Sequence, residues 1–146
     1  MSTRSYICIE NQDNTYTGIY CHSDGSLSWN GIMLYNFYSQ RKNVEELLAL
    51  GDISCLKEKI YPNPKKEHSF DNRQKNVTVA YSRDRGETGV EAHIISLKNL
   101  DEDGYIEYIY IFNKNNIWEY FESGKLKDGL KNLKEELINQ KIIKGV

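Results

Sequence analysis

The sequence predicts an α+β fold in which helices pack against a mainly antiparallel sheet of about six strands. Runs of β-branched and aromatic residues occur in pairs separated by short turns, and short connections favour antiparallel pairing. The helical patterns are grouped rather than alternated with the strands, which favours α+β over a doubly wound α/β fold. The expected order is ββ-ααα-ββββ-α, and 146 residues suit a single domain, 1–146, with one core of ordinary size.

The first pair of strands covers residues 5–10 and 16–23, on either side of a turn-forming cluster at 11–14. An alternation of period two places four apolar side chains on the face expected to meet the core, Ile7, Ile9, Ile19 and Cys21. In this hairpin Cys8 lies opposite Thr17 or Gly18 rather than Cys21. The three cysteines of the chain are therefore expected to be unbridged, as is typical of a reducing cytoplasm.

Three helices are expected next, at residues 30–39, 43–50 and 54–60. Asn30 and Asn43 stand at the starts of the first two, where an asparagine side chain can cap free backbone N–H groups. Gly51 follows the second helix and favours its termination. The long connection at 61–75 contains both prolines and many charged residues, and loops of this length are often functional or mobile.

A second hairpin is expected at residues 76–83 and 90–97, around a tip at 84–89, and an acidic turn follows at 98–104. The clearest hairpin comes next, because β-branched and aromatic residues fill 105–112 and 117–121 around the turn at 113–116. Its outer aromatic side chains either stack against a ligand or, as expected for most of them, are buried beneath helices or in a dimer interface: Tyr108, Tyr110, Phe112, Trp118 and Tyr120. The last element is an amphipathic helix at 126–142, whose apolar stripe consists of Leu126, Leu130, Leu133 and Leu137.

The net charge of −2 gives no long-range field that would attract nucleic acid or an anionic membrane, which excludes bulk nucleic-acid binding. The first residues do not form a signal peptide, and no apolar run is long enough to span a bilayer. The sequence carries no phosphate-binding loop, dinucleotide fingerprint or nucleophile elbow, and its three histidines are far apart with no zinc-ligand spacing. We therefore expect a cytoplasmic protein with no membrane partner, no metal and no cofactor, and the missing catalytic signatures argue against an enzyme.

The segment 81–86 is the strongest candidate for an anion site. Arg83 and Arg85 can make bidentate contacts with phosphate, and the glycine of this turn lets backbone amides approach an anion. Tyr81 precedes them and could pack against a base or ribose, while Arg4 could add a further cation. The alternative is a solvated hairpin tip with an Arg-Asp-Arg charge cluster, which needs no ligand.

A second candidate lies where the second strand ends, at 22–25. His22 titrates near neutral pH, so with Asp24 as an orienting carboxylate it could serve as a general base. The alternative is a strand end followed by an Asp-Gly turn, and a contact of His22 with a ligand is favoured over catalysis. Tyr20 and Trp29 are the nearby rings that could pack against a base.

Four phrases of the sequence occur together in one known group of proteins: TRS at 3–5, IYCHSDG at 19–25, LGDIS at 50–54 and YSRDRG at 81–86. Over residues 3–121 the chain resembles small uncharacterised proteins carried by bacteriophages and prophages. In that group a tryptophan usually follows the histidine of the second phrase, whereas Ser23 stands there in this chain. The resemblance implies no established activity, but it implies an accessory phage protein acting inside an infected or lysogenic bacterial host.

Three functions are consistent with these observations. The leading hypothesis is a non-enzymatic counter-defence protein that binds a small anionic, nucleotide-derived signal and sequesters it without cleavage. Its pocket is expected to be shared across a homodimer or a higher homo-oligomer, since exposed strand edges favour self-association. The second hypothesis is an inhibitor that covers a host defence protein with its aromatic sheet face. The third is a phosphoester hydrolase that uses His22 and Asp24.

Overall fold

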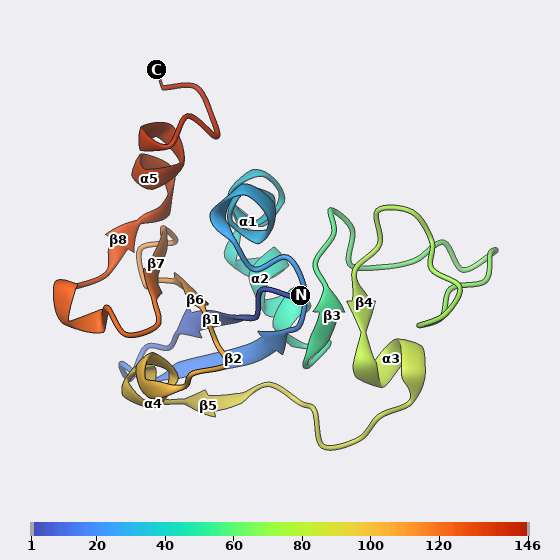
Figure 1. Ribbon diagram of the computed structural model, residues 1–146. Helices are drawn as coiled ribbons and strands as arrows, with labels where there is room; N and C mark the ends of the chain where they lie inside the picture. The colour runs from blue at the N-terminus through green and yellow to red at the C-terminus, as the bar shows by residue number, and fades with distance from the viewer. Residues whose placement is uncertain (1, 146) are drawn as a thin grey trace.

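The computed structural model describes residues 2–145, and at the centre of this part of the chain lies a mixed sheet of eight strands (Figure 1). Seven strands follow the order β4-β3-β2-β1-β6-β7-β8, and β5 also pairs with β2. The strands are β1 (Ser5–Glu10), β2 (Tyr16–Cys21), β3 (Ile53–Cys55), β4 (Val79–Ala80), β5 (His93–Ile95), β6 (Tyr108–Phe112), β7 (Trp118–Glu122) and β8 (Lys131–Asn132). The α+β class is confirmed, but the sheet is larger than expected and is mixed, because β1 pairs with β6, and β2 with β3, in parallel.

Helices cover the two faces of the sheet unequally. The larger core lies between one face and three helices, α1 (Ile32–Phe37), α2 (Arg41–Leu48) and α5 (Leu133–Asn139). A smaller core on the other face lies beneath α4 (Leu97–Glu102) and the short 3-10 turn η2 (Leu126–Asp128). Figure 1 shows α1 and α5 above the strands and α4 below them. None of the helices between residues 2 and 145 is long and apolar enough to cross a membrane.

The hairpin of β1 and β2 has the expected register. Cys8 lies opposite Gly18, and the apolar residues Ile7 and Ile19 face the larger core. A β-carbon on Gly18 would lie 2.9 Å from the sulfur of Cys8, so the glycine makes room for a thiol that is fully buried in the smaller core. All three cysteines are free and buried, as expected.

The hairpin of β6 and β7 is also confirmed, and it is antiparallel. Most of its aromatic side chains belong to the larger core rather than to the surface: Tyr110, Phe112, Trp118 and Tyr120 are buried, whereas Tyr108 is half-buried. The hydroxyl of Tyr110 donates a hydrogen bond of 2.6 Å to the carbonyl oxygen of Gly25, which satisfies its one polar atom inside the core.

Two predicted elements between residues 54 and 97 are wrong. Residues 54–60 do not form a helix, because Ile53 pairs with Cys21 of β2 and the residues of β3 are buried between β2 and β4. The predicted hairpin of 76–83 with 90–97 is also wrong, because β4 pairs with β3 and β5 pairs with β2. Between them lies a short helix, α3 (Tyr81–Arg85), which ends at Gly86 in the left-handed conformation.

The first two expected helices exist, but their predicted caps are wrong. A short π-helix, η1 (Leu27–Gly31), leads into α1, and Asn30 lies inside it as a buried residue. Its amide donates to the carbonyl oxygen of Ser23 at 3.2 Å, because the side chain points into the core rather than back along the helix. Asn43 lies within α2, which begins at Arg41. Gly51 follows α2 with a φ of 76°, which agrees with the expected end of this helix. A β-carbon at this position would clash with Val90.

The C-terminal segment is not one helix. η2, β8 and α5 take the place of the helix expected at 126–142, and α4 replaces the acidic turn expected at 98–104. Leu133 and Leu137 are buried in the larger core, whereas Leu126 and Leu130 pack against the smaller core on the other face. The leucine stripe is therefore divided between the two faces, because β8 carries the chain past the edge of the sheet.

This division predicts unequal effects of two leucine substitutions. Leu133→Ala should lower the free energy of unfolding by about 3 kcal/mol, because it empties a fully buried site. Leu130→Ala should cost less than about 1.5 kcal/mol, because this side chain is only half-buried. Urea denaturation measures both values. Equal losses would instead indicate one continuous apolar stripe.

Candidate functional site

Arg83, the residue expected to hold a phosphate, is bonded to the protein itself. Its guanidinium donates to both carboxylate oxygens of Asp84, at 2.8 and 3.0 Å, and to the carbonyl oxygens of Ile60 and Thr78. The segment 81–86 is a helical turn rather than a hairpin tip. Through its bonds to Thr78 and Ile60, Arg83 connects this turn to the start of β4 and to the residue before the long loop. Binding of a ligand by Arg83 stays a prediction. It would require Arg83 to share its bonds with Asp84, Ile60 and Thr78 with the ligand, or to give them up.

Asp84 is the centre of this arrangement, with only 2% of its side chain exposed. Besides Arg83, its carboxylate accepts the backbone N–H of Ala80 at 2.8 Å and a bond from Nε2 of His68 at 3.1 Å. Burial raises the pKa of this carboxyl, but the hydrogen bonds from Arg83, Ala80 and His68 outweigh burial and hold the pKa below its ordinary value. The carboxylate therefore links α3, β4 and the long loop as a charged group.

His68 extends this network into the loop. Its Nδ1 accepts the backbone N–H of Gln74 at 3.0 Å, so Nε2 carries the proton that is donated to Asp84. The side-chain amide of Gln74 in turn donates to the carbonyl oxygens of Asn63 and Lys66, at 2.9 and 3.1 Å. Residues 61–75 contain no helix or strand, but these bonds organise them around one buried side chain. Sequence reasoning missed this role of His68.

Arg85 and Tyr81 form an aromatic stack with the loop. The rings of Phe70 and Tyr81 are stacked with their centroids 5.7 Å apart, and the guanidinium of Arg85 lies 4.2 Å from the centroid of Phe70. Arg85 also pairs with Glu87. A second arginine, Arg73, lies 4.8 Å from the Phe70 centroid. The stack therefore positions Arg73, a loop residue that the sequence did not single out.

His22 and Tyr20 are brought together, whereas neither a hydrogen bond nor an ion pair joins Asp24 to the imidazole in the described chain. The hydroxyl of Tyr20 and Nδ1 of His22 are 2.7 Å apart, and the backbone N–H of Tyr20 donates to the carboxylate of Asp52. Burial raises the pKa of Tyr20, and the cationic side chain of Arg4 partly offsets this. The imidazole is thus paired with a phenol rather than with the carboxylate that the hydrolase hypothesis assigns to it.

Of the remaining predicted residues, Asp24 lines a pocket behind this strand end, whereas Trp29 and Arg4 do not. Asp24 is exposed in a left-handed conformation with a φ of 59°, and Trp29 is 64% exposed on η1. Asp24 lines a cavity of about 400 Å³ between β3, β4 and the long loop. We call this cavity the basic pocket, and it is lined by Ser23, Asp24, Cys55, Lys57, Arg73, Gln74, Lys75, Asn76, Val77 and Val79.

Three cations converge on the basic pocket from two segments of the chain. Lys57 follows β3, whereas Arg73 and Lys75 belong to the loop, and Asp24 is the one carboxylate among the lining residues. None of the three cations takes part in an ion pair within residues 2–145. The lining therefore carries three cations against one carboxylate, and this net positive charge favours an anion.

Local hydrogen bonds orient the lining residues. The Nε–H of Arg73 donates to the carbonyl oxygen of Phe70 at 2.8 Å, and Nη1 lies 3.8 Å from the sulfur of Cys55. The backbone N–H of Lys57 donates to the hydroxyl of Thr78, just before β4, at 2.9 Å. Polar side chains of Ser23 and Asn76 complete the wall, whereas the amide of Gln74 is used within the loop, so the pocket offers a hydroxyl and an amide beside its cations.

The buried network predicts how stability depends on pH. Because the folded-state pKa of Asp84 is lowered, its contribution is complete above the ordinary pKa of 3.8 and is lost as pH falls through the folded value. Asp84→Asn should therefore destabilise the protein at neutral pH, and its stability should fall less steeply below about pH 4 than that of the wild type. Denaturation at a series of pH values measures this difference.

Asp71→Asn is the matched control, because it makes the same change at an exposed position of the loop 61–75. It should follow the wild-type pH profile. An Asp84→Asn profile parallel to the wild type would show that the carboxylate does not carry the network.

In residues 2–145, no group of three or more His, Cys, Asp or Glu side chains is arranged to hold a metal ion. Comparisons of the chain with protein-family models, with curated proteins and with solved structures found no match.

Proposed function

We propose that the protein binds a small anionic, phosphate-bearing ligand in the basic pocket and holds it without cleaving it. The observation that carries this proposal is the convergence of Lys57, Arg73 and Lys75, which form no ion pairs in the described chain, on a cavity of about 400 Å³. A volume of this order accommodates a nucleotide-sized molecule. Charged hydrogen bonds from an arginine fork and two lysines would neutralise its phosphate groups.

This proposal keeps the expected ligand class but assigns different residues to it. Arg83, Asp84 and His68 serve as the support that holds the loop, and the loop presents Arg73 and Lys75 to the pocket. A nucleotide-derived signal is the ligand that agrees with the resemblance to accessory phage proteins. Sequestration of such a signal from host defence is then the biological role that we propose.

The geometry favours binding over hydrolysis. His22 is not among the residues that line the pocket, and its Nδ1 is paired with Tyr20. A general base for phosphoester hydrolysis must reach a water molecule beside the phosphate. The second alternative, an inhibitor that uses its aromatic sheet face, is also less favoured, because Tyr110 is fully buried and bonded to Gly25.

We predict that ligand binding depends on the pocket cations. A panel of pyrophosphate, ADP, ADP-ribose and cyclic dinucleotides should contain at least one ligand that raises the melting temperature. A ligand at a hundredfold excess over Kd adds about 2.7 kcal/mol of stability. For that ligand, Arg73→Gln and Lys57→Gln should each weaken binding about tenfold or more in calorimetric titrations, because each removes a charged hydrogen bond.

Lys65→Gln is the matched control, since it removes the same charge from an exposed position of the loop that does not line the pocket. It should bind like the wild type. Binding that depends on Arg85 but not on Arg73 or Lys57 would place the anion at α3 and refute the basic pocket. Chromatography of the recovered ligand tests sequestration, and a cleaved product that disappears in His22→Ala would support the hydrolase alternative.

A further inference from the structure

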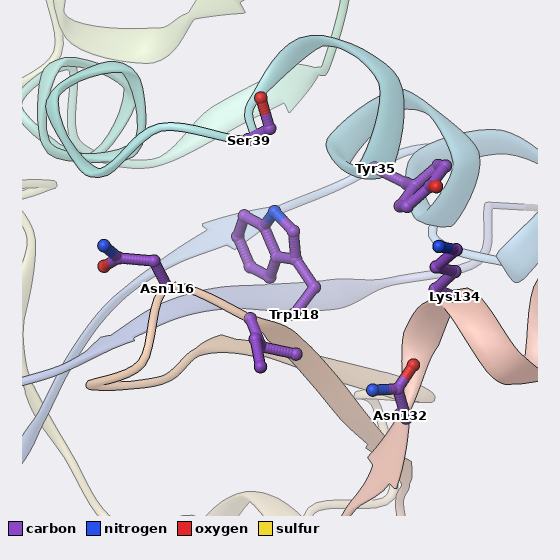
Figure 2. Close-up of a pocket in the computed structure, with 7 residues that line it drawn as sticks. Tyr35, Ser39, Asn116, Trp118, Asn132 and Lys134 are labelled. Atoms are coloured by element: carbon purple, nitrogen blue, oxygen red, sulfur yellow. The ribbon is translucent and has the colours of Figure 1, made fainter.

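A second cavity lies near the opposite edge of the sheet from the basic pocket, between α1, the turn before β7 and the junction of β8 with α5 (Figure 2). Its volume is about 270 Å³. We call it the aromatic slot, and it is lined by Tyr35, Ser39, Asn116, Ile117, Trp118, Asn132 and Lys134. It shares no lining residue with the basic pocket, so an inference about this slot does not depend on the function proposed above.

The base of the aromatic slot is a tryptophan with a fixed orientation. The indole N–H of Trp118 donates to the carbonyl oxygen of Tyr38 at 2.8 Å, and the ring packs edge-on against Phe112 with centroids 5.0 Å apart. Figure 2 shows Trp118 at the centre of the slot, between Asn116 on one side and Tyr35 with Lys134 on the other. Only 5% of Trp118 is exposed and its indole N–H is already bonded, so it contributes a small apolar area to the slot rather than a polar group.

The rim of the aromatic slot carries one charge. Lys134 is exposed and forms no ion pair within residues 2–145, and none of the lining residues is a carboxylate. Uncharged polar side chains of Ser39, Asn116 and Asn132 complete the rim. The oxygen of Asn132 caps α5 by accepting the N–H of Glu135 at 3.0 Å, which leaves its amide nitrogen as a donor toward the slot.

We infer that the aromatic slot binds a flat aromatic molecule that carries a single negatively charged group. The ring system packs in the slot against Ile117, Tyr35 and the small exposed part of Trp118, and the anionic group pairs with Lys134. A cavity near the small end of the range for ligand pockets suits one or two fused rings rather than a nucleotide. An aromatic carboxylate is the simplest molecule with both properties.

The test uses two probes of the same shape, 1-naphthoate and 1-naphthamide, which differ in charge. The chain has two tryptophans, so the indole N–H resonances in a ¹H–¹⁵N spectrum report the slot through Trp118 and the exposed surface through Trp29. Titration with naphthoate should shift the Trp118 resonance in a saturable manner and leave Trp29 unchanged. Naphthamide should bind about threefold more weakly, because it lacks the ion pair with Lys134.

Lys134→Met keeps the aliphatic chain and removes the charge, so it should abolish the preference for naphthoate while naphthamide binding remains. Lys131→Met is the matched control from β8, because it removes the same charge outside the slot, and it should keep the preference. The inference fails if naphthoate leaves the Trp118 resonance unchanged. Equal binding of the two probes by the wild type would also overturn it, because the ligand would then not need its charge. These measurements involve no phosphate ligand, so their outcome does not depend on whether the basic pocket binds an anion.

Discussion

The parallel pairing of β1 with β6 is the interaction on which the architecture depends. Each of these strands belongs to a local hairpin, and two hairpins alone would each leave one apolar face uncovered. Their pairing, from Ser5 opposite Tyr108 to Ile9 opposite Phe112, joins them into one sheet with two continuous faces. The helices then cover these faces, and the basic pocket and the aromatic slot form near opposite edges, where the short strands β4 and β8 end the sheet.

Asp84 has a comparable role for the basic pocket. A buried carboxylate is stable only when its charge is compensated, and here Arg83, Ala80 and His68 compensate it together. These partners come from α3, from β4 and from a loop without regular structure. Compensation of the one buried charge of Asp84 therefore holds these three segments together. The arginine and aspartate that resemble an anion site in the sequence thus provide the rigid support, while the binding groups that we propose are their neighbours in space.

Local signals allowed part of this structure to be predicted from the sequence. The hairpins of β1 with β2 and of β6 with β7 combine alternating apolar residues with turn residues, and both were predicted with the correct pairing. The parallel pairs and the position of β5 depend on contacts between distant segments, which no local pattern records. The leucines from 126 to 137 match a helical stripe, but the chain crosses the edge of the sheet between Leu130 and Leu133 and assigns them to different cores.

The candidate site shows the same limit. Residues 61–75 were noted as a long loop of a kind that is often functional or mobile, but which of its many charges converge depends on the bonds of His68 and Gln74. Lys57 reaches the same pocket from the end of a strand that was expected to be a helix, so its contribution could not be inferred. Tyr20 and His22 were correctly placed near each other because they lie two residues apart on one strand face.

The balance between local and overall charge limits the size of the ligand. The chain has a net charge of −2, and the exposed carboxylates Glu58, Glu67 and Asp71 lie close in sequence to the pocket cations. At physiological salt, charges interact over about 8 Å, so a small anion inside the cavity would be affected mainly by the charges that line it, which are Lys57, Arg73, Lys75 and the carboxylate of Asp24. A polyanion that extended beyond the rim would meet the carboxylates as well. For the proposed function, three cations within a weakly acidic surface would favour a compact anion over a nucleic-acid strand.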